Sequence, residues 1–286
     1  KLPGAKSAGR VQSVALRLIC EREFDIQSFI PQEYWTIESE LQKESKERFK
    51  ARLIIWKGDK LEKLSLNNEQ SAKEAIKSIE NSDLEVVKNE EKKEFRNPRA
   101  PFTTSTLQQE ASRKLSFSAS RTMRAAQKLY EGLNIGSEVT GLITYMRTDS
   151  VQLSKDSITD LRKMITNEYG DSYCPEKLKI YKSKVANAQE AHEAIRPTDV
   201  KRMPKTVKAY LDDDCYKLYD LIWKRTVSSQ MASAIINKTI IDVESINKSD
   251  IQNFVTLRAN GSVIKFDGFL KIYNEGVDEK NTTEMD

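Results

Sequence analysis

The spacing of apolar residues changes twice along this 286-residue chain, and that change constrains the fold more than any single motif does. From about residue 31 to 95, apolar and polar residues alternate in two runs, around Trp35 and around Leu53, which is the period of a β-strand with one buried face. Between about residues 96 and 230 the apolar residues recur every three or four positions, as in an amphipathic helix. The period of two returns after residue 231. A β region therefore flanks a helical region on both sides.

The simplest architecture for this order is a helical domain inserted into a β-rich domain, so we expect an α+β fold. The helical domain takes residues 96–230, and the β-rich domain is discontinuous, with residues 31–95 and 231–286. The chain then passes between the two domains near residues 97–98 and 228–229. Two neighbouring connections of this kind act as a hinge.

A separate helix is expected at the start of the chain. Its apolar residues form one stripe, at Val11, Val14, Ala15, Leu18 and Ile19. This spacing predicts a helix with one buried face. We assign residues 1–30 to a helical segment of a further helical domain.

Local signals predict several boundaries. Ser105 and Gln108 have the spacing of a capping box, and Asn260-Gly261 between two alternating runs is a strong signal for a hairpin turn. Three more residues are expected to begin or end helices: Ser118, Ser154 and Gly170.

Residues 141–150 (GLITYMRTDS) place a tyrosine two positions from an arginine, among hydroxyl and carboxylate side chains. A phenol with a pKa of roughly 10 is a poor nucleophile at neutral pH, so its attack on a phosphate needs positive charge nearby. Arg147 can supply that charge. If the segment is extended, Tyr145, Arg147 and Asp149 share one face. The same residues are more often a strand end that runs into a hydrogen-bonded turn, so spacing alone leaves both interpretations open.

Four motifs, taken together, resemble those of bacterial type IA DNA topoisomerases and follow the family's order. Residues 7–15 (SAGRVQSVA) resemble its strand-contacting helix start, and residues 100–109 (APFTTSTLQQ) resemble the entry to its helical gate domain. Residues 141–150 resemble its active-site motif, and residues 190–198 (EAHEAIRPT) its histidine motif. The resemblance runs from residue 1 to about residue 273. It implies that the β-rich region is an arch that lets the helical domain lift and open a gate.

The resemblance implies three catalytic residues. Tyr145 would attack one DNA strand and form a 5′-phosphotyrosine, and Arg147 would stabilise the pentacoordinate phosphate. His192, the only histidine in the chain, would contact phosphate or take part in proton transfer, although a lone histidine is more often a packing or hydrogen-bonding residue. Arg196 is expected to hold the same loop through salt bridges.

The resemblance also implies contacts with single-stranded DNA. Ordinary alternatives remain, since Ser7 suits helix capping and an i, i+4 polar pair such as Gln127 and Glu131 suits a solvated helix face. The residues implied are Ser7, Arg10, Gln12, Gln127, Glu131 and Thr144.

Composition sets broad limits. A net charge of +4 and a pI near 8.7 are only a weak indication of nucleic-acid binding. With 31% charged residues, a mean hydropathy of -0.62 and no apolar span, we expect a soluble protein. We also expect it to be cytoplasmic and monomeric. The cysteines Cys20, Cys174 and Cys215 lack the spacing of a zinc site, so free thiols are expected.

The resembled family uses Mg²⁺ held by an acidic cluster in a separate nucleotide-transferase-like (Toprim) domain. Residues 212–214 (DDD) look superficially like part of that cluster, but they begin a predicted helix, where capping explains them. We therefore expect no metal ligands in this chain and the Mg²⁺ ligands of the full-length enzyme before Lys1. The chain begins without an initiator methionine, which favours an excised piece of a longer protein.

The sequence thus predicts part of an ATP-independent enzyme that cleaves and religates one DNA strand and relaxes negative supercoils. One alternative is a module that binds single-stranded DNA and has no activity in isolation. A weaker one is a tyrosine nuclease or recombinase, which would carry a different order of arginines and histidine around its tyrosine.

Overall fold

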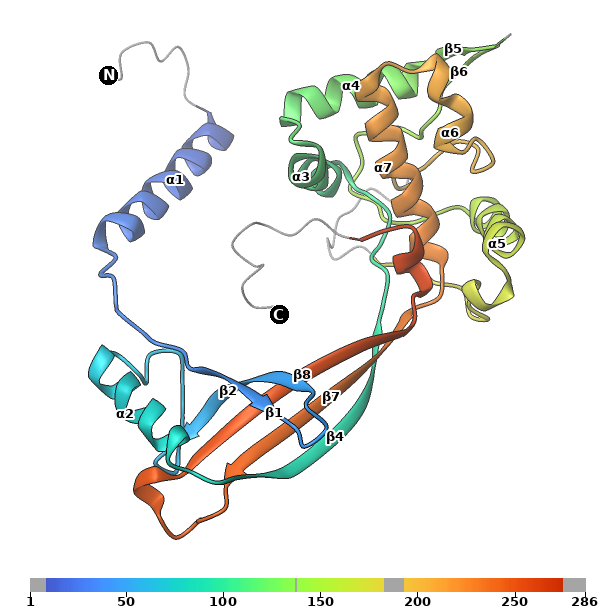
Figure 1. The fold of residues 1–286 in the computed structure, drawn as a ribbon. Coiled ribbons are helices and arrows are strands. Elements are labelled where there is room, and N and C mark those ends of the chain that lie inside the picture. The colour runs from blue at the N-terminus through green and yellow to red at the C-terminus, as the bar shows by residue number, and fades with distance from the viewer. Residues whose placement is uncertain (1–8, 137, 183–192, 275–286) are drawn as a thin grey trace. The chain divides into compact units, whose positions relative to one another are not determined.

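The computed structural model describes residues 9–136, 138–182 and 193–274 (Figure 1). The chain divides into two compact units, which are described separately. The first consists of Lys1–Glu91 and Thr239–Gly261, and the second of Lys92–Lys238 and Ser262–Asp286. Among the described residues, no helix has both the length and the apolar character that crossing a membrane requires.

The first unit is built on an antiparallel sheet. Its strands lie in the order β1-β2-β8-β7-β4, with β3 paired to β2. Strands β1 and β2 pair antiparallel, with Glu40 facing Lys50, and both strands lie where the alternation predicted strands. The strands are β1 (Glu38–Gln42), β2 (Arg48–Trp56), β3 (Asp59–Lys60), β4 (Leu84–Arg96), β7 (Ala234–Ser245) and β8 (Val255–Phe266), of which β4, β7 and β8 continue into the second unit.

Helix α2 (Glu69–Glu80) packs on this sheet. Asn68 caps it by accepting a hydrogen bond from the Ser71 N–H at 2.8 Å. Ala75 is fully buried in the sheet's apolar cluster, and the Trp56 indole donates to the Ser78 hydroxyl at 3.1 Å. One apolar face and one polar contact therefore fix α2 on the sheet.

The predicted hairpin at Asn260-Gly261 is wrong. Strand β8 runs through both residues without a turn, and neither has a positive φ. A two-residue hairpin of type I′ needs positive φ at both central positions, whereas here β8, which lies between β2 and β7 in the sheet, continues as an extended strand. The chain reverses earlier, between β7 and β8, through a short 3-10 turn at Ile251–Asn253.

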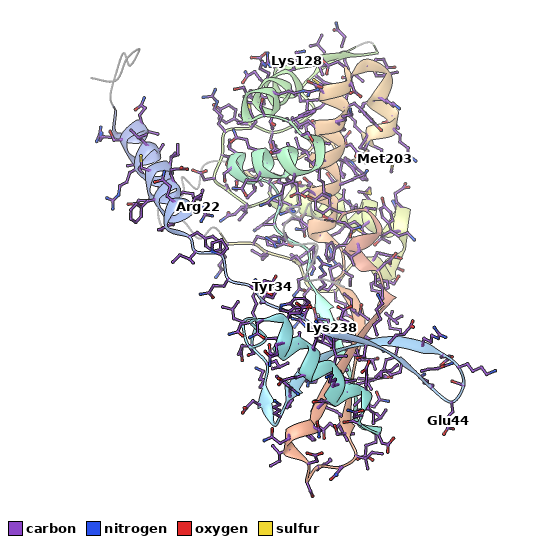
Figure 2. The ribbon with its side chains drawn as sticks, turned by 60° about the vertical axis from the view of Figure 1, so that its left-hand side comes forward. Arg22, Tyr34, Glu44, Lys128, Met203 and Lys238 are labelled. Carbon is purple, nitrogen blue, oxygen red and sulfur yellow. The ribbon has the colours of Figure 1, made fainter. Side chains whose placement is uncertain are left out.

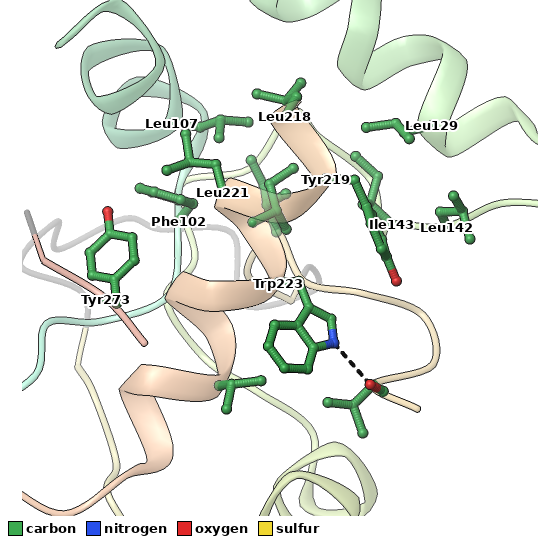
Figure 3. Packing of buried hydrophobic residues seen from close by; sticks show 14 of the residues in the cluster. Phe102, Leu107, Leu129, Leu142, Ile143, Leu218, Tyr219, Leu221, Trp223 and Tyr273 are labelled. Atoms are coloured by element: carbon green, nitrogen blue, oxygen red, sulfur yellow. Dashed lines mark hydrogen bonds between the residues drawn. The ribbon is translucent and has the colours of Figure 1, made fainter. Parts of the chain in front are cut away.

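The second unit is mainly helical, which with the sheet confirms the α+β class. Its longest helix, α7, is the most buried, with Leu218, Tyr219 and Ile222 inaccessible to solvent (Figure 3). The Trp223 indole at its inner face donates to the Val200 carbonyl at 2.9 Å. The elements are α3 (Thr104–Leu115), α4 (Ala119–Glu131), a hairpin of β5 (Leu133–Ile135) and β6 (Glu138–Thr140), α5 (Lys155–Tyr169), α6 (Pro204–Val207) and α7 (Asp213–Gln230).

Two predicted caps are confirmed and one is displaced. Ser118 and Ser154 cap α4 and α5, and α5 ends at Gly170, whose φ of 96° suits glycine. The capping box of α3 uses Thr103 and Thr106 instead of Ser105 and Gln108. Four hydroxyl-bearing side chains in a row, at residues 103–106 (TTST), can cap a helix, and the position of the preceding backbone determines which of them does so.

The two segments predicted to connect the domains, near residues 97–98 and 228–229, both lie within the second unit, and they lie beside each other. The Tyr181 hydroxyl is 3.1 Å from the Pro98 carbonyl and 2.9 Å from the Ser229 carbonyl, and burial raises the pKa of Tyr181 to about 12. The Ser233 hydroxyl donates to Asn97 at 2.6 Å. Hydrogen bonds of Tyr181 and Ser233 thus hold these two segments together within the second unit.

Helix α1 (Arg10–Ser28) forms as predicted, and burial of its apolar face stays a prediction for the full-length protein. None of its side chains, Arg22 among them, is buried by the residues that the structure describes (Figure 2). Val14 and Ile19, both in the apolar stripe, are 59% and 65% exposed. The stripe specifies a helix, whereas burial also requires a partner surface.

Candidate active site

The segment with Tyr145 has no regular secondary structure, yet its side chains alternate between solvent and core. A single β-bridge joins Ile143 to Pro197. Beyond it, the exposed side chains are those of Tyr145, Arg147 and Asp149, and the buried ones are those of Met146, Thr148 and Ser150. The shared face predicted for an extended segment is therefore confirmed. It places the tyrosine and the arginine on the same exposed side.

One side of this segment is held by the start of α3. The Thr104 hydroxyl donates to the Met146 carbonyl at 2.8 Å and accepts from the Thr148 N–H at 2.8 Å. The Thr104 N–H donates to the Thr148 carbonyl at 2.9 Å. The backbone is therefore fixed on both sides of Arg147.

The residue before the tyrosine is held by the segment after His192. The Thr144 hydroxyl donates to the Ala194 carbonyl at 2.7 Å and accepts from the Arg196 N–H at 3.0 Å. The Thr144 N–H donates to the Arg196 carbonyl at 2.9 Å. Thr144, predicted to contact DNA, thus holds the loop through its half-buried side chain, and its DNA contact stays a prediction.

Arg196 forms the expected salt bridge. Its guanidinium contacts the Glu193 carboxylate at 2.6 Å, and the other Glu193 oxygen accepts the Ser154 N–H at 2.8 Å. Burial raises the pKa of Glu193, but hydrogen bonds from Arg196 and Ser154 outweigh it and leave the pKa lowered. The pair ties the loop to the start of α5. His192 lies outside the described residues.

Tyr145 contacts an aromatic ring from α4. Its ring meets that of Tyr130 edge to face, with centroids 5.3 Å apart and an interplanar angle of 63°. Both rings are partly exposed, at 38% for Tyr145 and 41% for Tyr130. Gln127 and Glu131, joined by a hydrogen bond, lie one turn before and one residue after Tyr130 on α4. The structure therefore brings this predicted pair to the helix beside the tyrosine.

Gly141 allows this approach of α4 and the loop. A side chain at this position would place its Cβ 2.5 Å from the Tyr130 carbonyl oxygen, which no real Cβ tolerates. The Leu142 N–H also donates to the Leu129 carbonyl at 2.7 Å. The loop therefore begins in direct backbone contact with the end of α4.

Arg147 is exposed and forms no hydrogen bond or ion pair with any residue in the described part of the chain. Asp149, on the same face, does not pair with it either. The loop is held by Thr104 and Thr144, so its shape does not depend on an Arg147–Asp149 ion pair. The guanidinium is available to an anionic ligand.

The predicted DNA contacts near the N-terminus belong to the other unit. Arg10 is the first residue of α1, and both Arg10 and Gln12 are exposed. Gly9 precedes the helix and provides no side-chain cap. Ser7 lies outside the described residues. The roles of these residues stay predictions.

The aspartates at residues 212–214 act as the sequence analysis expects. Asp212 caps α7 by accepting the Cys215 N–H at 2.8 Å, and it pairs with Lys128 at 3.0 Å. Asp214 forms a two-point hydrogen bond with Arg121 at 2.7 and 2.8 Å. Within residues 9–136, 138–182 and 193–274, no group of three or more acidic, histidine or cysteine side chains could hold a metal ion. These aspartates therefore do not fit a Mg²⁺ site.

Sequence reasoning missed Thr104, Tyr130 and Glu193. Tyr130 had a usable signal, because it lies three residues after Gln127 and shares its helix face. Thr104 and Glu193 contact residues 39 to 44 positions away, and no local pattern reports such contacts.

A family model described as DNA topoisomerase matches residues 1–286. DNA topoisomerase 1 of Rickettsia felis is 53% identical over 284 residues, which cover 99% of this chain and 36% of that protein. DNA topoisomerase 1 of Zymomonas mobilis is 50% identical and is covered over 22% of its length. The structure of full-length topoisomerase I from Thermotoga maritima matches with a TM-score of 0.75 and 33% identity, over 96% of this chain and 42% of that one. The chain thus spans about a third or less of the length of these curated relatives.

Proposed function

This chain belongs to the bacterial DNA topoisomerase family, and from that premise we propose that it carries the strand-cleaving tyrosine of a type IA enzyme. The observation that carries the proposal is the shared exposed face of Tyr145 and Arg147 on a loop whose alternate residues are buried. A nucleophile and a cation presented together suit attack on a phosphodiester.

In the proposed reaction, the Tyr145 hydroxyl oxygen attacks the phosphorus of one DNA strand. The phosphorus–oxygen bond to the upstream 3′ oxygen breaks, which leaves a 5′-phosphotyrosine and a free 3′-hydroxyl. The phenolic proton leaves the tyrosine, and the departing 3′ oxygen takes up a proton. Arg147 stabilises the charge on the phosphorane. Religation reverses these steps, so no ATP is needed.

For the full-length protein we propose relaxation of negatively supercoiled DNA, by passing a strand through the break. Its DNA partner is single-stranded at the cleavage site, and the protein acts as a monomer in the cytoplasm. We propose that Mg²⁺ assists this reaction in the full-length enzyme and is held by residues outside this chain.

Covalent trapping in the full-length protein tests the proposal. With a single-stranded oligonucleotide, denaturation during cleavage should leave protein on the label of a 3′-labelled strand, while a 5′ label stays on a free fragment. Tyr145→Phe should abolish the adduct, because the change removes only the attacking oxygen. Tyr130→Phe is the matched control, since it keeps the ring that contacts Tyr145 and should keep the adduct. Protein on the 5′ label would indicate a 3′-phosphotyrosine and a recombinase-like enzyme.

A second candidate, a module that only binds single-stranded DNA, concerns this chain by itself. It is favoured by the small share of the relatives that the chain covers. We expect the 286-residue chain to bind single strands without relaxing supercoiled plasmid in Mg²⁺. Metal-dependent relaxation by the purified chain would contradict this expectation.

A further inference from the structure

The hydroxyl of Thr104 is not needed by the helix that it begins. Thr103 is the N-cap of α3, and its side chain and that of Thr106 satisfy each other's backbone N–H groups at 3.3 and 2.9 Å. Leu107 and Ala111 bury the inner face of α3. The helix thus has its cap and its packing without the Thr104 side chain.

The Thr104 hydroxyl instead forms hydrogen bonds with the loop of Tyr145, whose residues lie 42 to 44 positions later in the sequence. A hydroxyl has one proton to donate and two lone pairs to accept. The proton points to the Met146 carbonyl at 2.8 Å, with the Thr148 carbonyl at 3.2 Å, and a lone pair receives the Thr148 N–H at 2.8 Å. One small side chain therefore satisfies backbone groups on both sides of Arg147.

These contacts decide where the two reactive side chains lie. Met146 follows Tyr145 directly, and its side chain is 1% exposed, so the loop cannot turn at this point without disturbing the core. Thr144 fixes the other side of the tyrosine. The Arg147 side chain forms no hydrogen bond or ion pair with the described residues, so its placement depends on the backbone that carries it.

We propose that Thr104 is a positioning residue for strand cleavage, because its hydroxyl fixes the backbone that presents Tyr145 and Arg147 to the same phosphodiester. The inference rests on the proposed function. It assigns to the start of α3 a role in the chemistry, although Thr104 does not itself touch the reacting atoms. A positioning residue raises the reaction rate because it holds the reactive groups within a fraction of an ångström of the geometry that the reaction needs.

The test uses the full-length enzyme and single-turnover cleavage of a single-stranded oligonucleotide. Thr104→Val keeps the shape and removes the hydroxyl, and it should slow cleavage about tenfold or more while strand affinity stays within about twofold. Thr104→Ser keeps the hydroxyl and should restore a rate close to that of the unchanged enzyme.

Thr106→Val is the matched control, because it breaks the capping box of the same helix, and among the described residues the Thr106 side chain forms its hydrogen bonds with Thr103 and with no residue of the loop. It should lower the melting temperature by as much as Thr104→Val or more, and leave the cleavage rate nearly unchanged. Equal losses of rate in the two variants would show that α3 stability alone matters and would overturn the proposal.

A double substitution distinguishes a positioning role of Thr104 from a role in stability alone. Because Thr104 would position Arg147 as well as Tyr145, Thr104→Val should slow an Arg147→Ala enzyme less than it slows the unchanged one. Fully additive losses would overturn the proposal, and so would a failure of Thr104→Ser to restore the rate. If the unchanged enzyme forms no adduct at Tyr145, the proposed function fails. If the adduct forms and Thr104→Val cleaves at the normal rate, only the inference about Thr104 fails.

Discussion

Helix α1 and the loop of residues 141–150 are opposites in how they are held. The helix satisfies its backbone hydrogen bonds within itself and buries no side chain among the described residues. The loop has no regular hydrogen bonding, yet backbone and hydroxyl groups of α3, of α4 and of residues 194–198 hold it. Both regions carry predicted DNA-binding residues. The comparison shows that regular secondary structure and a fixed position in space are separate properties.

The difference has a physical basis. A helix needs only local sequence to form, whereas a loop that presents two reactive groups must be fixed by distant parts of the chain. The alternation of burial in the loop keeps its polar face outward while Met146 and Thr148 anchor it from within. Changes in the loop should therefore alter stability and chemistry, and equivalent changes in α1 should not.

The largest difference between the two regions is expected in the free energy of unfolding when one leucine in each is replaced by alanine. Leu142 is inaccessible to solvent, so Leu142→Ala should lower the free energy of unfolding by about 2–5 kcal/mol. Leu18 on α1 is 61% exposed, and Leu18→Ala should change it by about 0.5 kcal/mol or less. Urea unfolding of the chain measures both. A comparable loss for Leu18→Ala would mean that α1 packs against the rest of the chain in solution.

The next largest effect concerns Arg147 in the full-length enzyme. Arg147→Ala should slow cleavage by about a hundredfold or more, the usual scale for one lost transition-state donor. Arg147→Lys should slow it less, because lysine keeps the charge but loses the two-point geometry of the guanidinium. Single-strand affinity should change much less in both variants.

Asp149→Asn separates this role from a structural one. If Arg147 served to tie down the loop through Asp149, both Asp149→Asn and Arg147→Ala would lower the melting temperature and activity together. The structure contains no ion pair between them, so we expect the melting temperature to be unchanged in both variants. Equal losses of stability and activity would contradict the catalytic role.

Much of the fold could be predicted because it depends on local pattern. The pairing of β1 with β2 and the starts of α4, α5 and α7 follow from alternation and from single capping residues. The errors arose where tertiary contacts decide. Asn260-Gly261 stays extended as part of the long strand β8 of the sheet, and α3 begins at Thr104 because Phe102, just before its cap, is bridged to Ile195.

The site was predictable in part for the same reason. The period of two placed Tyr145 and Arg147 on one face without any knowledge of the fold. The groups that hold this face come from residues such as Thr104 and Ala194, which lie 42 to 50 positions from their partners. Sequence periodicity reports which side of a segment is buried, but it does not identify what covers it.

A smaller effect is expected from the pH dependence of the Glu193–Arg196 pair. The pKa of Glu193 is lowered below its ordinary 4.5, so its stabilisation is complete above that value and is lost as the pH falls through the lowered one. Glu193→Gln should therefore destabilise the chain by roughly 1 kcal/mol at pH 7, and the difference should vanish well below pH 4.5.

The Arg17–Glu21 pair of α1 is the matched control for this measurement. Its side chains are 78% and 54% exposed, compared with 17% and 29% for Arg196 and Glu193. Solvent and salt screen such a pair, so Glu21→Gln should cost about 0.5 kcal/mol or less. If Glu193→Gln and Glu21→Gln lowered the stability equally in thermal melts at pH 7, partial burial would not strengthen the Glu193–Arg196 pair.

The smallest expected effect is in the salt dependence of single-strand binding by this chain. Each phosphate contact contributes about -0.7 to the slope of log affinity against log salt concentration, so the loss of one contact is measurable by titration at several salt concentrations. Arg147→Ala should make the slope shallower by about that amount, because the loop holds the backbone of this arginine in place. Arg10→Ala should change it by less than half as much. When a DNA strand binds Arg10, helix α1 must also become ordered, because none of its side chains is buried by the described residues. The entropy cost of this ordering offsets part of the binding free energy that the contact contributes. Equal changes in slope would show that α1 contributes as a preformed part of the binding surface, and the contrast between the two regions would then not extend to DNA binding.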